Sequence, residues 1–170
     1  MIVLLNMDLE LEEAAAIQYI NHAVMLTGIA YRKIAAVLKA FAFQKIKHAI
    51  ILADQIHYLG GYPSLRVGNV HASEDNNQML EYDFDDEQDA IWRYKIRIGQ
   101  AEQLKEIELV KRLGAILWVE QRHAMYIKKQ LSSGPEHADD STIRIIDACD
   151  FSQTWTERAV HVPVRTKRQN

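Results

Sequence analysis

The stretch QKIKHAIILAD, residues 44–54, places two ionisable side chains inside an apolar helical run. Lys45 and His48 are three positions apart, a spacing that puts both on one face of a helix. The stretch WVEQRHAMYI, residues 118–127, has the same spacing with a glutamate in place of the lysine. These two stretches predict long helices whose buried faces carry charged groups.

Four amphipathic runs of this kind follow one another along the chain. Gly28 follows the first run, GGYP at 60–63 stops the second, and SSGP at 132–135 ends the fourth, as expected at helix ends. The third and fourth runs meet without a glycine or proline between them. The predicted helices span residues 3–27, 32–59, 77–106 and 107–131.

The connections between these runs predict the topology. The first and second runs are joined by a few residues, as are the third and fourth, so each pair is expected to form an antiparallel hairpin. Residues 60–76 reach about 55 Å when extended, which is enough to run the whole length of a helix of about 40 Å. We therefore predict an all-α, four-helix bundle over 1–131, with one long crossover between the second and third helices.

Residues 132–170 are expected to form a short C-terminal helix and a tail of the same domain. Asp140 or Ser141 would cap that helix, and HVPVRTKRQN would follow it as an irregular basic tail. The net charge of −3 makes a nucleic-acid partner unlikely. The opening MIVLLNM is too short to cross a bilayer, and a single cysteine fits a reducing compartment, so a cytoplasmic protein without a membrane partner is expected.

Ionisable residues occupy the middle of every predicted core face. Charged side chains are seldom buried without partners, and carboxylates and imidazoles that converge at one level suit a divalent metal. Each half of the chain also has the pattern E-x32-[K/E]-x2-H, which predicts two related hairpins. The six residues concerned are Glu12, Lys45, His48, Glu87, Glu120 and His123.

At these positions the sequence resembles the bacterioferritins of the ferritin-like superfamily. QYINHA at 18–23, KHA at 47–49 and LGG at 59–61, followed by YP, fall in the register of that family. The resemblance implies two irons in the bundle, oxidation of Fe(II), and storage in a homo-oligomeric shell of 24 subunits. It also implies that Glu12 and His48 hold one metal, that Glu87 and His123 hold the other with Glu120 bridging them, and that Tyr19 lies beside the centre.

The sequence departs from the bacterioferritin pattern in its second helix. Lys45 stands where a second bridging glutamate is expected, and Ile46 where a methionine ligates haem, so no haem is expected by that route. Ala40 and Gln44 replace a histidine and an aspartate that collect iron. The C-terminal tail is also longer than usual.

Lys45 leaves three interpretations of the metal site open. With three carboxylates and one ammonium the net charge is −2, which balances one divalent ion. First, Lys45 pairs with Glu12 and Glu120, and one metal stays at Glu87 and His123. Second, the ion pairs need no metal at all. Third, Lys45 swings outward and two metals bind. A lysine with a lowered pKa, acting as a reactive amine, is a further alternative.

The expected function is therefore iron binding and storage, with a ferroxidase activity weakened or lost through Lys45; divalent metals other than iron also suit the site. The alternatives are a structural shell subunit that needs a second, active ferritin subunit, and a small di-metal oxidase acting on an organic substrate. The remaining histidines are expected at the surface or at caps, and Trp92, Trp118, Tyr94 and Tyr126 in packing. Those histidines are His22, His57, His71, His137 and His161.

Overall fold

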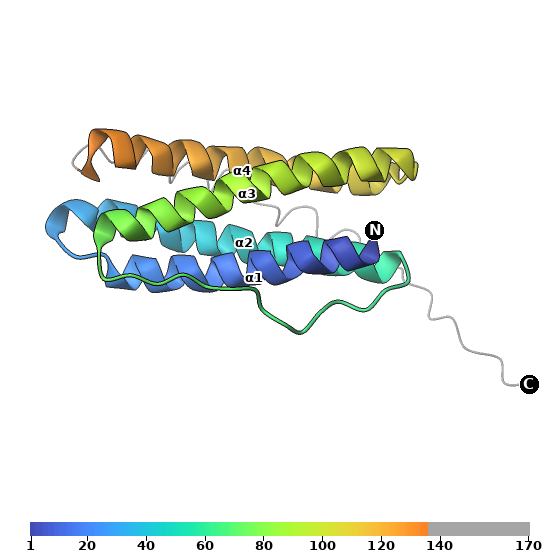
Figure 1. Cartoon of the computed structure of the whole chain (residues 1–170), viewed down its shortest axis with the longest axis horizontal. Helices are drawn as coiled ribbons and strands as arrows, with labels where there is room; N and C mark the ends of the chain where they lie inside the picture. Colours follow the sequence, from blue (N-terminus) through green and yellow to red (C-terminus); the bar gives the residue numbers. More distant parts are fainter. Residues whose placement is uncertain (136–170) are drawn as a thin grey trace, which may run out of the picture. The chain divides into compact units, whose positions relative to one another are not determined.

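The computed structural model describes residues 1–135, and these form four long helices (Figure 1). The predicted C-terminal helix and tail, and Cys149, lie outside the described residues. None of the described helices is long and apolar enough to span a membrane. The helices are α1 (Ile2–Met25), α2 (Arg32–Tyr58), α3 (Asn76–Gln103) and α4 (Ile107–Ser133), with a short 3-10 turn η1 (Ile29–Tyr31) before α2.

The helices pair as the connection lengths predict. α1 packs along α2 and α3 along α4, each pair antiparallel, and α1 also contacts α3 while α2 contacts α4 (Figure 1). The segment between α2 and α3 runs back along the bundle, so that α3 points the same way as α2. The predicted all-α bundle with one long crossover is confirmed.

The crossover lies against α1 along much of its length (Figure 1). The Gly68 amide donates a hydrogen bond of 2.9 Å to the carbonyl oxygen of Glu10. A side chain at position 68 would crowd Leu11 and this same carbonyl at 3.1 and 3.2 Å, so glycine allows the close approach. Farther on, the His71 amide donates to Gln18 Oε1 at 2.8 Å. Both contacts fix the start of α3 beside α1.

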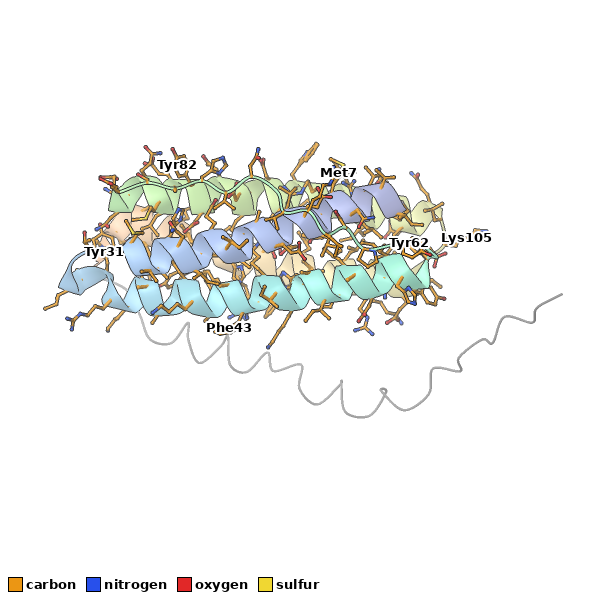
Figure 2. The ribbon with its side chains drawn as sticks, turned by 90° about the horizontal axis from the view of Figure 1, so that it is seen from below. Met7, Tyr31, Phe43, Tyr62, Tyr82 and Lys105 are labelled. Carbon is orange, nitrogen blue, oxygen red and sulfur yellow. The ribbon has the colours of Figure 1, made fainter. Side chains whose placement is uncertain are left out.

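A tight turn joins α3 to α4 without a glycine or proline. Lys105, labelled in Figure 2, has a φ of 59° and so takes the left-handed conformation usually given to glycine. The Glu106 amide donates to the Ala101 carbonyl at 3.0 Å, which closes the end of α3. The boundary predicted directly between 106 and 107 therefore contains a turn of three residues, 104–106.

The core is apolar toward the end of the bundle that holds the α1 N-terminus, and polar at mid-length. The apolar cluster includes Leu5, Leu9, Leu52, Ile56, Tyr94, Leu109, Leu113 and Ile116. The apolar spacing of the third run predicts Phe84, Ile91 and Ile98 on the buried face of α3, but these three residues are only half-buried. Asp83, Ala90 and Arg97 are buried instead, one position away. The helix is rotated because these polar residues find partners inside the bundle.

Candidate metal centre

All seven residues singled out from the sequence meet in one buried layer at mid-bundle. α1 contributes Glu12 and Tyr19, α2 contributes Lys45 and His48, α3 contributes Glu87, and α4 contributes Glu120 and His123. None of these side chains belongs to a residue more than 5% exposed. Their convergence follows from the spacing of three and four positions on four helices that cross at one level.

Ligand atoms in this layer form two groups, each with three atoms within 4.8 Å of one another. One group joins Glu12, His48 and Glu120, and the other joins Glu87, Glu120 and His123. Glu120 belongs to both groups. Carboxylate and imidazole donors in such groups suit iron, zinc and similar divalent ions.

Lys45 lies inside the layer rather than swinging outward. Its Nζ is hydrogen-bonded to Glu120 Oε2, lies 3.1 Å from Glu87 Oε2, and is 3.7 Å from Glu12 Oε2. Burial opposes its charge, but the three carboxylates outweigh burial and raise the pKa of Lys45 above its ordinary value. This direction is opposite to the lowered pKa of the reactive-amine alternative, and the three carboxylates favour the ammonium form of Lys45.

His48 is also held as a cation. Its Nδ1 lies 2.7 Å from Glu120 Oε1 and 3.2 Å from Glu12 Oε2. Burial alone would lower the pKa of His48, but the hydrogen bonds and charges of these two glutamates raise it to about 9. His48 therefore pairs with the half of the layer that contains Glu12, whereas Lys45 lies between the two halves, nearer to Glu87 than to Glu12.

His123 has the opposite electrostatic environment. Burial, together with the nearby Lys45 and His48 cations, keeps the pKa of His123 well below its ordinary value although Glu120 opposes this. Its Nε2 lies 2.5 Å from Gln44 Oε1, and its Nδ1 lies 3.1 Å from Glu87 Oε1. The imidazole is neutral, and neutral imidazole is the form that binds metal.

Two tyrosines hold carboxylates of the layer. The Tyr19 hydroxyl donates to Glu87 Oε1, and the Tyr94 hydroxyl donates to Glu12 Oε1 at 2.7 Å. Burial, and then the neighbouring glutamate charges, raise the pKa of both phenols well above their ordinary value. Both tyrosines are therefore neutral donors, which orient the carboxylates without adding charge.

A cavity of about 30 Å³ adjoins this layer between α1, α3 and the crossover. Glu12 and Lys45 line its inner part, and the exposed Asn69 lies on the crossover side. Ala14, Ala15 and Ala90 leave the space open because their side chains are small. A volume of this size suits about two water molecules rather than an organic substrate.

Several partners in the layer and beside it were not expected from the sequence. Gln44 contacts His123, and Tyr94 is a hydrogen-bond donor as well as a packing residue. The surface position expected for His22 is wrong, since His22 is fully buried and its Nδ1 lies 2.8 Å from Asp83 Oδ1. A helical spacing reports which residues share a face, but these contacts depend on helix rotation and rotamers.

Two tryptophans differ from expectation as well. Trp92 and Trp118, expected in packing, are 65% and 50% exposed. Trp118 carries the Arg122 guanidinium 4.5 Å above its ring, a cation–π contact at the surface. His57 and His71 are exposed as expected, and the predicted surface positions of His137 and His161 lie outside the described residues.

Comparison with known proteins agrees with this geometry. A profile of the ferritin-like domain matches residues 2–136. This chain belongs to the ferritin-like family. A bacterioferritin of Streptomyces coelicolor is 30% identical over 128 residues, which are 75% of this chain and 77% of that protein. Bacterioferritin BfrA of Mycobacterium tuberculosis is 29% identical over 129 residues, or 75% and 81%.

Solved structures give the same family. A ferritin-like diiron-carboxylate protein from Bacillus anthracis superposes with a TM-score of 0.74 at 33% identity, covering 76% of this chain and 94% of that one. The crystal structure of BfrA from M. tuberculosis also superposes at 0.74, with 25% identity and coverage of 85% and 91%. The predicted ferritin-like bundle and the resemblance to bacterioferritins are confirmed for the described part of the chain.

Proposed function

We propose that this ferritin-like protein is a bacterioferritin-like iron-binding and iron-storage protein with an altered centre. Fe(II) is the cargo, bound within the helical bundle and oxidised there by O2 or peroxide. The carrying observation is that Lys45 approaches all three glutamates of the layer. The protein's own ammonium therefore takes a place that a second divalent ion would need.

The neutral His123 and the ion pairs of His48 support a single iron in the half of the layer that contains His123. Lys45 and His48 already compensate Glu12 and Glu120 at short range. In the other half, Glu87, Glu120 and the neutral His123 present a carboxylate and imidazole ligand set. We therefore propose Glu87, Glu120 and His123 as the occupied ligands, with Glu12 and His48 as ligands only after Lys45 is removed.

The residues around this half orient the ligands. The Tyr19 hydroxyl donates to Glu87 and so fixes one carboxylate oxygen. Lys45 lowers the negative charge next to the bound iron, which favours Fe(II) over the more highly charged Fe(III). A single Fe(II) also releases one electron, whereas reduction of O2 to peroxide takes two. We therefore expect slower oxidation than in a centre that holds two irons.

The proposal also includes the oligomeric state and the cellular location of the protein. The bacterioferritin relatives and the exposed apolar stripes on α1 and α2 support a homo-oligomeric shell in the cytoplasm. No haem is proposed, because position 46 is isoleucine. A purely structural subunit, working beside a second ferritin subunit, is the alternative that the ion pairs of Lys45 favour, since they balance charge without iron.

The test is iron content per chain after anaerobic loading with Fe(II) and desalting, for wild type and Lys45→Glu. We expect about one iron in wild type and about two in the variant, with faster oxidation by O2 in the variant. Lys47→Glu, which adds the same charge change at an exposed position of α2, is the matched control and should behave as wild type. Two irons in wild type would overturn the charge argument, and none in either chain would favour the structural subunit.

A further inference from the structure

The His123 ring contacts two aromatic rings and two oxygen acceptors. Phe41 stacks on it with a centroid distance of 3.8 Å and an interplanar angle of 26°. Tyr19 meets it edge-on at 6.3 Å. Its two nitrogens face Gln44 Oε1 at 2.5 Å and Glu87 Oε1 at 3.1 Å. The ring plane is therefore fixed, and only the position of its proton is left to be decided.

Both oxygens that face the ring are acceptors. An amide oxygen and a carboxylate oxygen each need a proton from the ring to form a hydrogen bond, but a neutral imidazole has only one. Gln44 Oε1 lies closer to its ring nitrogen, at 2.5 Å, than Glu87 Oε1 does, at 3.1 Å. With the proton on Nε2, the lone pair of Nδ1 and an oxygen of Glu87 face each other without a proton between them. That arrangement is resolved by a cation bound to both atoms.

We propose that Gln44 is a positioning residue that accepts the Nε2 proton of His123 and so directs Nδ1 toward the metal. This inference rests on the proposed iron site and adds the residue that prepares its imidazole. Groups that hydrogen-bond the second nitrogen of a ligating histidine fix its tautomer and its orientation. Gln44 is itself 8% exposed, so bulk water has little access to this contact.

The same inference explains why two histidines at one spacing behave differently. His48 Nδ1 lies between two carboxylates and is protonated there. His123 has one carboxylate on Nδ1 and an amide oxygen on Nε2. The amide of Gln44 supplies an acceptor for His123 without adding a charge beside the ring. The two histidines therefore have unlike surroundings, since His48 Nδ1 faces two carboxylates whereas His123 faces one carboxylate and one amide oxygen.

The experiment uses the full chain and begins without metal. Long-range 1H–15N NMR of histidine rings, recorded after chelation, reports which nitrogen of His123 carries the proton, and His123→Gln assigns the signal. We expect the Nε2–H form in wild type, and a ring protonated on both nitrogens in Gln44→Glu, which places a second carboxylate beside His123. Gln44→Met should lose that preference. The affinity of Gln44→Met for Co2+, measured from the visible absorption of the bound ion, should be about 10- to 100-fold lower than that of wild type.

Gln130→Met is the matched control. Gln130 is a buried glutamine on α4 whose side-chain amide has no hydrogen-bond partner among residues 1–135. Its replacement should leave the His123 tautomer and Co2+ affinity unchanged. An Nδ1–H form in wild type, or unchanged tautomer and affinity in Gln44→Met, overturns the proposal. If wild type binds no Co2+ yet shows the Nε2–H form, which Gln44→Met loses, the proton placement stands and the proposed metal site fails.

Discussion

At the scale of single residues, Lys45 is the side chain on which the proposed one-iron centre depends. Its ammonium group is nearly inaccessible to water and compensates three glutamates. Removing one partner of a buried ion pair leaves the others without compensation. The lysine is therefore expected to stabilise the metal-free bundle.

Lys45→Met should destabilise the metal-free protein by about 3–5 kcal/mol in the free energy of unfolding. Added Zn2+ should recover much of this loss, because the ion replaces the missing positive charge. Urea unfolding with a chelator and with Zn2+ measures both effects. Lys47→Met, at an exposed position on the same helix, should change stability by less than about 0.5 kcal/mol. A variant as stable as wild type in the chelator would contradict this role.

A second buried ion pair, away from the metal layer, predicts a pH effect. Asp8 is buried, with Arg97 Nε donating to its Oδ2 at 2.7 Å and Arg93 Nε 3.3 Å from its Oδ1. Burial raises the pKa of Asp8 above its ordinary value of 3.8, more than the arginines lower it. A carboxyl with a raised folded pKa contributes stability below its unfolded pKa, and this is lost as pH rises through the folded pKa.

The stability of wild type minus that of Asp8→Asn should therefore fall as pH rises above about 3.8. The slope should not exceed about 1.4 kcal/mol per pH unit, and it should vanish above the folded pKa. Urea unfolding across the acid range measures this difference. Glu108→Gln removes an exposed pair with Arg112 and should show a much weaker trend. A difference that rises with pH would contradict the prediction.

The candidate site was predictable as a set of ligands but not as an arrangement of protons. The helical spacing and its repeat in both halves brought Glu12, Glu87 and Glu120 to one level. The partners Gln44 and Tyr94 lie on the same faces but contact the ligands only because of their rotamers. A sequence indicates the helix face on which a residue lies, whereas the direction of its side chain depends on packing.

At the scale of elements, the four helices and the crossover were predictable because their signals are long. An apolar periodicity that extends over more than twenty residues predicts a helix even where single positions depart from the pattern. The lengths of the loops then allow few topologies. The rotation of α3 was not predictable, because Asp83 and Arg97 look like surface residues until their partners on α1 are known. The α3–α4 turn was not predictable either, since it uses a lysine where glycine is usual.

The turn between α3 and α4 predicts a stabilising substitution. Lys105 has a φ of 59°, which costs an ordinary residue roughly 1–2 kcal/mol relative to the right-handed conformation. Lys105→Gly removes that cost but adds unfolded-chain entropy, so the net gain should be about 0.5–1 kcal/mol. Thermal unfolding measures it. Lys105→Ala keeps the Cβ atom and should show no gain, so equal gains in both variants would contradict the argument.

At the scale of the whole molecule, the described part of the chain exposes several large apolar side chains on α1 and α2. Phe43, labelled in Figure 2, is 72% exposed, and Ile46 and Ile50 continue its stripe along α2. On α1 the exposed residues Ile17 and Ile20 follow a similar spacing. The two halves of the metal layer differ, but both are built from residues of one chain, so the layer is complete without a partner. In the proposed shell, assembly would serve storage, and the apolar stripes are surfaces suited to it.

The α2 stripe predicts how assembly is lost. Introducing two charges with Phe43→Glu and Ile50→Glu should convert a homo-oligomer into smaller species, because unpaired charges cannot be buried between subunits. Light scattering after size-exclusion chromatography gives the mass of each variant, and circular dichroism checks that the helices persist. Trp92→Glu, on α3 and 65% exposed, is the control and should keep the wild-type mass. A monomeric wild type would remove the shell from the proposed function. It would favour a small oxidase, although the narrow, charged cavity beside Lys45 limits the substrate such an enzyme could take.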